Sequence, residues 1–185
     1  TILDISIRKR QSAINPFFSF GNRLITPWPQ ETHVNSDSNN NLILVTGGSG
    51  YIGGRLIPRL LDAGYRVRAL ARTPKKLAGR PWGNHPNLEI IKGDVLDPDS
   101  LTAAAAHCRA AYYLVHSMLP GVNDFANTDR TDAENMAHAA SHAGLGQIIY
   151  LSGLGEDNPD LSHHLQSRTE VGNYLRQGNV PVTIL

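Results

Sequence analysis

A glycine-rich segment directly after a short apolar run is the feature that most constrains how this 185-residue chain can fold. Residues 42–45 read Leu-Ile-Leu-Val, and the next nine residues place Gly47, Gly50 and Gly53 in a G-x-x-G-x-x-G spacing. A glycine at the turn permits unusual backbone angles, a middle glycine lets the backbone approach a pyrophosphate, and a third lets a helix pack closely. The pattern therefore predicts a nucleotide site at the helix N-terminus, with a glycine-rich turn that binds no ligand as the alternative. The residues expected to seat the phosphates are Gly47, Ser49, Gly50, Tyr51, Ile52 and Gly53.

From residue 41 onward, predicted strands and helices alternate. The strands are expected at residues 42–45, 66–71, 88–92, 111–115, 147–151 and 182–185. The helices are expected at residues 55–63, 74–77, 97–107, 125–142 and 162–176. Short apolar strands that alternate with helices favour an α/β fold with a parallel sheet covered on both faces. Six strands fit the doubly wound order 3-2-1-4-5-6 of the Rossmann fold.

The first 40 residues differ from the rest, because no helical or alternating period persists there. We expect residues 1–40 to form an irregular or disordered extension and residues 41–185 to form a dinucleotide-binding domain. The chain starts at Thr1 and stops in the predicted sixth strand, so we expect truncation before a C-terminal substrate-binding part. We expect a cytoplasmic protein. Organellar targeting by the extension is the alternative, which Asp4 and Glu31 weaken.

Composition excludes several functions. The chain has 17 Lys and Arg against 16 Asp and Glu, and a net charge of +1 does not predict a nucleic-acid partner. Cys108 is the single cysteine, so the chain has neither an internal disulfide nor a cysteine zinc site. No apolar run reaches the roughly 18 residues of a membrane-spanning helix. His138 and His142 stand four residues apart on one helix face, which offers at most a two-point site, so no metal site is predicted.

The end of the second strand bears on which cofactor binds. An NAD site usually carries Asp or Glu about 20 residues after the glycines, to bond the ribose 2′-hydroxyl. Here Arg72 stands in that region, followed by Lys75 and Lys76. A guanidinium can hold the 2′-phosphate of NADP, so NADP is favoured and NAD remains open. The alternative is that these cations are only a solvated helix entry.

Four segments together resemble a known family. They are the glycine turn, Gly-Asp-Val at 93–95, Tyr-Leu-Val-His-Ser-Met at 113–118, and Tyr-Leu-Ser-Gly-Leu-Gly at 150–155 with its following helix. With them, residues 41–185 resemble the atypical short-chain dehydrogenase/reductase superfamily, in its NmrA-like NAD(P)-binding branch. The chain looks most similar to bacterial members that carry the motif at 113–118.

The resemblance implies roles for several residues. Asp94 and Val95 would hold the adenine, with Asp94 accepting from its amino group; the alternative for Asp94 is a turn residue. Ser152 would orient a substrate carbonyl, or else is a turn hydroxyl. His116 would contact cofactor or substrate, or else is a buried, hydrogen-bonded histidine. The residues that would line the nicotinamide-ribose side are Leu114, Val115, His116 and Ser117.

The chain departs from the family's catalytic pattern. Family reductases use Tyr-x-x-x-Lys, in which the lysine lowers the pKa of the tyrosine. His164 and Arg168 stand at those positions here. A histidine can act as a general acid near neutral pH, but a neighbouring arginine disfavours its protonated form. We expect Ser152, His164 and Arg168 to be the catalytic residues, with a surface role for His164 as the alternative.

These features lead to two hypotheses of function. The first is an NADP-preferring oxidoreductase that transfers hydride to or from a small carbonyl or related metabolite. The second is a non-catalytic NAD(P)-binding redox sensor or accessory subunit, which the missing Tyr-x-x-x-Lys favours. The expected partners are a nicotinamide dinucleotide and an unidentified small substrate, with a homo-oligomer or a larger complex left open.

Overall fold

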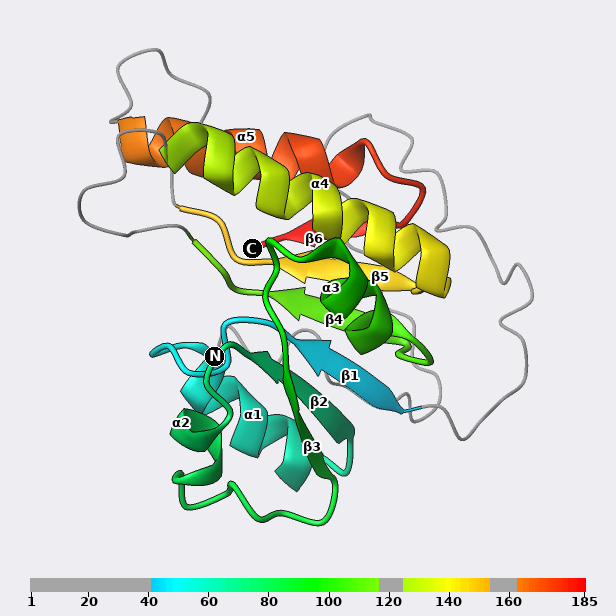
Figure 1. Cartoon of the computed structure of the whole chain (residues 1–185). Helices are drawn as coiled ribbons and strands as arrows, with labels where there is room; N and C mark the ends of the chain where they lie inside the picture. The colour runs from blue at the N-terminus through cyan, green and yellow to red at the C-terminus, as the bar shows by residue number, and fades with distance from the viewer. Residues whose placement is uncertain (1–40, 117–124, 154–162) are drawn as a thin grey trace, which may run out of the picture. The chain divides into compact units, whose positions relative to one another are not determined.

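The computed structural model describes residues 41–116, 125–153 and 163–185 (Figure 1). The six strands of the sheet are all parallel, in the order β3-β2-β1-β4-β5-β6. The strands are β1 (Leu42–Val45), β2 (Arg66–Ala71), β3 (Leu88–Lys92), β4 (Ala110–Tyr113), β5 (Gln147–Tyr150) and β6 (Val182–Ile184). The helices are α1 (Gly53–Asp62), α2 (Lys75–Ala78), α3 (Pro98–Ala105), α4 (Phe125–Ala143) and α5 (His163–Arg176). This arrangement confirms the predicted doubly wound Rossmann fold.

The central strand β1 is buried on both faces, as its unbroken apolar run predicted. Leu42 and Leu44 belong to the core under α3, α4 and α5, whereas Ile43 and Val45 belong to the core under α1 and α2. Figure 1 shows these two helical layers on opposite sides of the sheet. The alternation follows from strand geometry, because successive side chains point to opposite faces.

Several boundaries differ from the sequence prediction, most informatively at the end of β4. We predicted a strand over 111–115, but β4 ends at Tyr113. The amide of Leu114 donates to the Thr46 hydroxyl at 3.3 Å, and that hydroxyl donates to the Tyr112 carbonyl at 3.4 Å. A side chain that follows β1 therefore replaces the strand ladder, and residues 114–116 leave the sheet.

Glycine and capping residues mark the ends of other helices. Helix α1 begins at Gly53, two residues earlier than predicted, and is followed by Gly64 at a φ of +84°. Helix α3 is capped by Asp97, whose carboxylate accepts from the amides of Asp99 and Ser100. Such a cap satisfies amides that the first turn of a helix leaves without partners.

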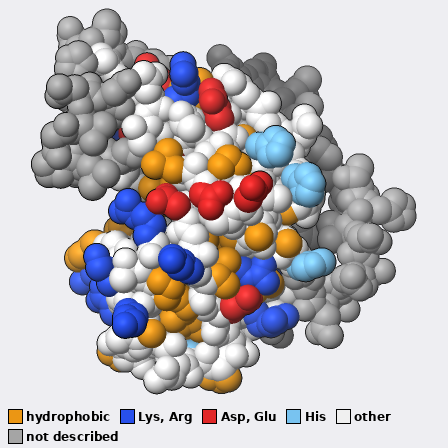
Figure 2. Space-filling view, viewed as in Figure 1, with side chains coloured by type: hydrophobic (Ala, Val, Ile, Leu, Met, Phe, Trp, Pro, Cys, Tyr) orange, Lys and Arg blue, Asp and Glu red, His pale blue; other side chains and the backbone are white. Residues whose placement is uncertain are grey.

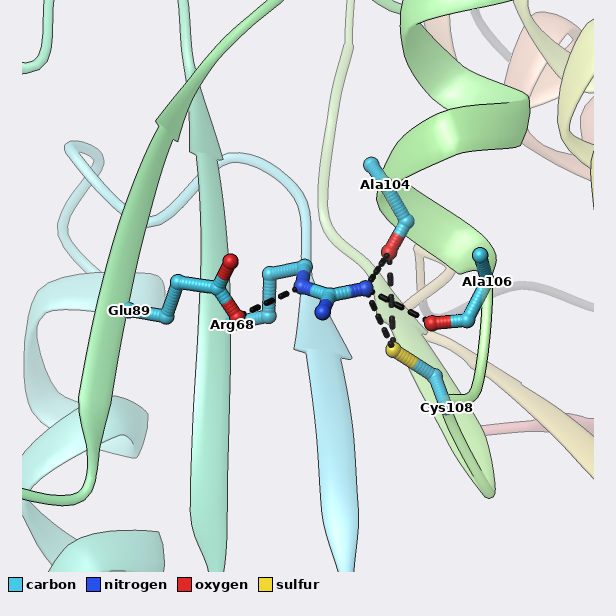
Figure 3. A network of polar contacts seen from close by, with 5 residues as sticks. All are labelled: Arg68, Glu89, Ala104, Ala106 and Cys108. Atoms are coloured by element: carbon cyan, nitrogen blue, oxygen red, sulfur yellow. Dashed lines mark hydrogen bonds and ion pairs between the residues drawn. The ribbon is translucent and has the colours of Figure 1, made fainter.

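A half-buried arginine on β2, Arg68, joins β2 to β3 and to the end of α3 (Figure 3). Arg68 donates through Nε to Glu89 on β3 at 2.8 Å, and through Nη1 to the carbonyls of Ala104 and Ala106 at 2.9 and 2.7 Å. A cation at a helix C-terminus is stabilised by the helix dipole, so Arg68 caps α3. Burial raises the pKa of the neighbouring Cys108 thiol to about 11, which leaves it protonated and unreactive near neutral pH.

No helix among the described residues is both long and apolar enough to cross a membrane. In the described ranges no group of three His, Cys, Asp or Glu side chains is arranged to hold a metal ion. His138 and His142 stack on α4 with ring centroids 6.4 Å apart, as their spacing predicted.

Candidate cofactor site

The glycine turn after β1 is closed so tightly that two of its three glycines are required by packing. Gly47 has a φ of +70°, and a Cβ there would lie 2.6 Å from the Leu114 carbonyl oxygen. A Cβ on Gly53 would lie 2.5 Å from the Gly47 carbonyl oxygen. At Gly50 the nearest atom would be 3.3 Å away, which is a tight contact rather than a clash. The turn itself therefore explains Gly47 and Gly53, while the predicted role of Gly50 concerns close approach of a ligand.

The start of α1 offers free hydrogen-bond donors. No side chain caps this helix, and its first turn holds no acid. Among described residues, no partner accepts from the amides of Tyr51 and Ile52, and both residues are exposed. The Arg55 guanidinium lies 3.6 Å from the centre of the Tyr51 ring and adds a cation beside these amides. Free amides, the helix dipole and a cation together suit the pyrophosphate of a dinucleotide.

A cavity of about 300 Å³ lies at the carboxyl ends of the strands, beside the glycine turn. Doubly wound folds bind their ligands at this edge, where the strand order reverses between β1 and β4. Six of its lining residues were predicted from the sequence: Ser49, Arg72, Asp94, Val95, Val115 and His116. The remaining lining residues are Leu70, Ala71, Gly93, Leu96, Thr128 and Asp132. The turn and this cavity together fit a nucleotide.

One wall of the cavity, at the end of β2, is basic rather than acidic. Arg72 is exposed and has no carboxylate partner in the described part of the chain. The position that an acid occupies in many NAD sites is therefore held by an uncompensated guanidinium, as expected from the sequence.

At the end of β3, Asp94 both shapes a turn and lines the cavity. Its Oδ1 accepts from the Leu96 amide at 3.3 Å, and its own amide donates to the Ser100 hydroxyl at 3.1 Å. The preceding Gly93 leaves no room for a side chain, because a Cβ would lie 2.6 Å from Leu70. The turn role that we gave as the alternative is thus present, and it presents Asp94 to the cavity as well.

His116 and Tyr150 meet between the ends of β4 and β5. Their ring centroids are 5.8 Å apart, and His116 is half-buried on the cavity wall. The Tyr150 hydroxyl donates to the Arg168 carbonyl at 3.1 Å, and burial raises the pKa of this phenol well above its usual range. Burial, with the carboxylates of Asp132 and Asp129 nearby, also raises the pKa of Tyr113. Neither tyrosine has the lowered pKa of a catalytic tyrosine, and both serve as packing residues.

The predicted catalytic residues are described only in part. Ser152 and Arg168 lie together, since Arg168 Nη1 donates to the Ser152 carbonyl at 3.4 Å. The Nε of Arg168 is buried and has no acceptor among the described residues. His164 falls in the first turn of α5, but its side chain lies outside the described residues, as does all of Ser117.

Sequence reasoning missed two acids on α4. Asp129 and Asp132 are buried, at 8% and 2% exposure. Asp129 accepts from the Ser167 hydroxyl at 2.8 Å and so joins α4 to α5, whereas Asp132 lines the cavity. Their helical spacing could have revealed them, because both acids fall on the face of α4 that also buries Ala133, Met136 and Ala140.

The fold and the site define a Rossmann-type nucleotide-binding domain. A family model described as NAD(P)H-binding matches residues 47–185, and the chain belongs to this family. The prediction of a nicotinamide dinucleotide as cofactor is thereby confirmed.

Individual relatives are more distant. The 3 beta-hydroxysteroid dehydrogenase/Delta 5-->4-isomerase of Mycobacterium tuberculosis is 33% identical over 121 residues, which cover 60% of this chain and 31% of that protein. The (4-alkanoyl-5-oxo-2,5-dihydrofuran-3-yl)methyl phosphate reductase of Streptomyces griseus is 30% identical over 145 residues, covering 78% of this chain and 46% of the relative. The chain thus spans about a third to a half of the length of these relatives.

Solved structures share the fold. The Citrobacter sp. triphenylmethane reductase complexed with NADP(H) matches with a TM-score of 0.63 and 23% identity, over 77% of this chain and 47% of that one. The NADPH-dependent quinone oxidoreductase of Escherichia coli, complexed with NADPH, matches with a TM-score of 0.64, 23% identity and the same coverage.

Proposed function

We propose that this chain is the cofactor-binding part of an NADP(H)-dependent reductase of the atypical short-chain dehydrogenase/reductase type, in its NmrA-like branch. The observation that carries the proposal is the cavity beside the glycine turn, whose β2 wall presents Arg72 instead of an acid. A guanidinium binds a 2′-phosphate by charge-assisted hydrogen bonds, and a ribose hydroxyl lacks that charge. Relatives named as a dehydrogenase and a reductase, and fold neighbours solved with NADP(H), support this class.

Each predicted site residue has a part in this proposal. The amides around Ser49, Tyr51 and Ile52 bind the pyrophosphate, in the turn formed by Gly47, Gly50 and Gly53. Asp94 and Val95 hold the adenine. The nicotinamide-ribose side is lined by Val115, His116 and Ser117. When bound, the nicotinamide supplies or accepts a hydride.

For the chemical step, Ser152 orients a small carbonyl and His164 exchanges the proton. Arg168 donates to the Ser152 backbone carbonyl, which supports a role for its positive charge near the substrate oxygen that Ser152 would orient. A fixed cation there stabilises negative charge that develops on that oxygen. The proposed substrate is a small carbonyl compound or a related metabolite.

The second candidate is an NAD(P)-binding redox sensor or accessory subunit without turnover. Two observations favour it: Tyr-x-x-x-Lys is replaced by a histidine and an arginine, and the tyrosines buried near the cavity have raised pKa values. Cofactor binding itself does not separate the two candidates, because both need the site.

Calorimetric titration of the chain with NADPH and NADH tests the cofactor preference. We expect tighter binding of NADPH, and Arg72→Ala should weaken it about tenfold while changing NADH binding less than about twofold. Arg66→Ala is the matched control, because Arg66 is also an exposed arginine but begins β2, at the end opposite to Arg72. Equal binding of the two cofactors by the unchanged chain would contradict the preference.

Turnover needs a separate measurement. Consumption of NADPH against aldehydes, ketones and quinones should occur and should fall strongly in His164→Ala. Unchanged turnover in that variant would remove His164 from the mechanism. NADPH binding without consumption of any member of the panel would support the regulator instead.

A further inference from the structure

Arg72 of the cavity wall and three basic residues that follow it in sequence have no acidic partners in the described ranges. Both ion pairs found there involve other arginines, Arg68 and Arg130. We call the exposed residues Arg72, Lys75, Lys76 and Arg80 the basic rim. Figure 2 shows Lys and Arg side chains gathered over the half of the viewed face that carries β1 to β3 with α1 and α2. Cations without carboxylate partners create a positive field that attracts an anion.

Helix packing holds Arg80 over the glycine turn. Leu77 of α2 is fully buried, and its Cδ1 would lie 3.7 Å from a Cβ on Gly48. This is an ordinary packing distance, so α2 lies against the turn through Leu77. The Arg80 amide donates to the Leu77 carbonyl at 3.0 Å, and the Gly83 amide donates to the Arg80 carbonyl at 2.8 Å. These bonds fix the Arg80 backbone just after the buried anchor.

The Arg80 guanidinium lies near the N-terminus of α1, an environment that disfavours a cation without a bound anion. Its Nη2 donates to the Ser49 carbonyl at 3.3 Å, which is long for such a bond. Its Cζ is 3.9 Å from the Cβ position of Gly54, in the first turn of α1. The partial positive charge at a helix N-terminus repels a cation. A bound anion removes this repulsion, because it interacts favourably with both the guanidinium and the N-terminus of α1.

We propose that Arg80 is a second arginine of the site for the 2′-phosphate of the adenosine ribose. Ser49 and Arg72 line one cavity, and Arg80 donates to the Ser49 carbonyl, so Arg80 is bonded to a residue that shares the cavity with Arg72. Arg80 exchanges the long bond to the Ser49 carbonyl for a charge-assisted bond to a phosphate oxygen. The inference rests on the proposed preference for NADP(H) and deepens it by adding a specificity-determining residue.

The experiment compares adenosine 2′,5′-bisphosphate with adenosine 5′-monophosphate, two probes that differ only in the 2′-phosphate. Calorimetry on the whole chain gives both affinities for the unchanged chain, Arg80→Ala, Arg80→Gln and Arg72→Ala. We expect each Arg80 variant to weaken the bisphosphate about five- to tenfold and the monophosphate less than about twofold. Arg59→Ala is the matched control, since Arg59 is exposed in the last turn of α1, and it should change neither affinity.

Each outcome has a distinct meaning. If Arg72→Ala abolishes the preference for the bisphosphate but both Arg80 variants keep it, the role of Arg80 is overturned while the NADP preference stands. If the Arg80 variants weaken both probes equally, Arg80 serves the 5′-phosphate or the fold, and the proposal is wrong. If the unchanged chain shows no preference between the probes, the NADP proposal and the Arg80 role both fall. Unfolding temperatures of all variants separate loss of binding from loss of fold.

Discussion

A methyl group added to Gly53 should destabilise the domain, although alanine is a better helix former than glycine. The new Cβ would lie 2.5 Å from the Gly47 carbonyl oxygen and 2.6 Å from the Gly48 Cα. Both are backbone atoms, and the first contact is about 0.9 Å shorter than the 3.4 Å at which ordinary contact begins. The glycine turn and α1 must therefore move apart.

The magnitude follows from two opposing effects. Overpacking typically costs about 1–3 kcal/mol, and a clash between backbone atoms belongs at the upper end. Replacing a helical glycine by alanine returns about 1 kcal/mol. We expect Gly53→Ala to lower the free energy of unfolding by about 2 kcal/mol, which is about 4–8 °C in melting temperature for a domain of this size.

Thermal unfolding followed by circular dichroism measures this effect, and the neighbouring glycine supplies the control. A Cβ on Gly54 would find its nearest atom at 3.8 Å, so Gly54→Ala should keep or raise the melting temperature. NADPH binding should weaken in Gly53→Ala, because the shifted turn carries the amides of Tyr51 and Ile52. If the two variants melt alike, the close approach of α1 to the glycine turn does not determine stability and the reasoning is wrong.

Three further predictions concern residues away from the turn. Arg68→Met leaves the part-buried carbonyls at the end of α3 without this donor and should cost about 1–3 kcal/mol in chemical denaturation; an unchanged midpoint would refute the capping role. Cys108 should resist a thiol reagent at pH 8 until the chain unfolds, and rapid labelling of the folded chain would contradict its burial. Because its folded pKa of about 11 lies above the unfolded value, the thiol's contribution to stability is complete below about pH 8.5 and is lost as the pH rises through 11. Ser167→Ala removes a donor to Asp129 and should lower the unfolding free energy by about 1 kcal/mol, whereas exposed Thr131→Ala should change it little.

The sheet was predictable because its determinants are local. The apolar run of β1, the glycine spacing and the Asp97 cap act within a few residues, and right-handed crossovers then limit the strand order. The end of β4 was missed because its determinant is distant in sequence. The apolar run at 111–115 does not indicate that the Leu114 amide donates to the Thr46 hydroxyl instead of to a neighbouring strand.

The candidate site was predictable to a smaller degree. Arg72 and Asp94 follow strands directly, and the carboxyl ends of parallel strands meet at one edge, so their place on the cavity followed from topology. The position of Arg80 depends on Leu77 packing against the turn at Gly48, and no pattern of spacing encodes that contact. Asp132 lies inside a helix rather than directly after a strand, so this topological argument did not reach it. The catalytic roles of Ser152, His164 and Arg168 stay predictions.

The Thr46 hydroxyl has a consequence for how this scaffold can vary. Thr46 is almost fully buried, and its hydroxyl accepts from the Leu114 amide while donating to the Tyr112 carbonyl of β4. These bonds tie the segment after β1 to the segment after β4, at the point where the strand order reverses. Because the partners of the Thr46 hydroxyl are backbone atoms of Tyr112 and Leu114, this tie does not depend on which side chains line the cavity.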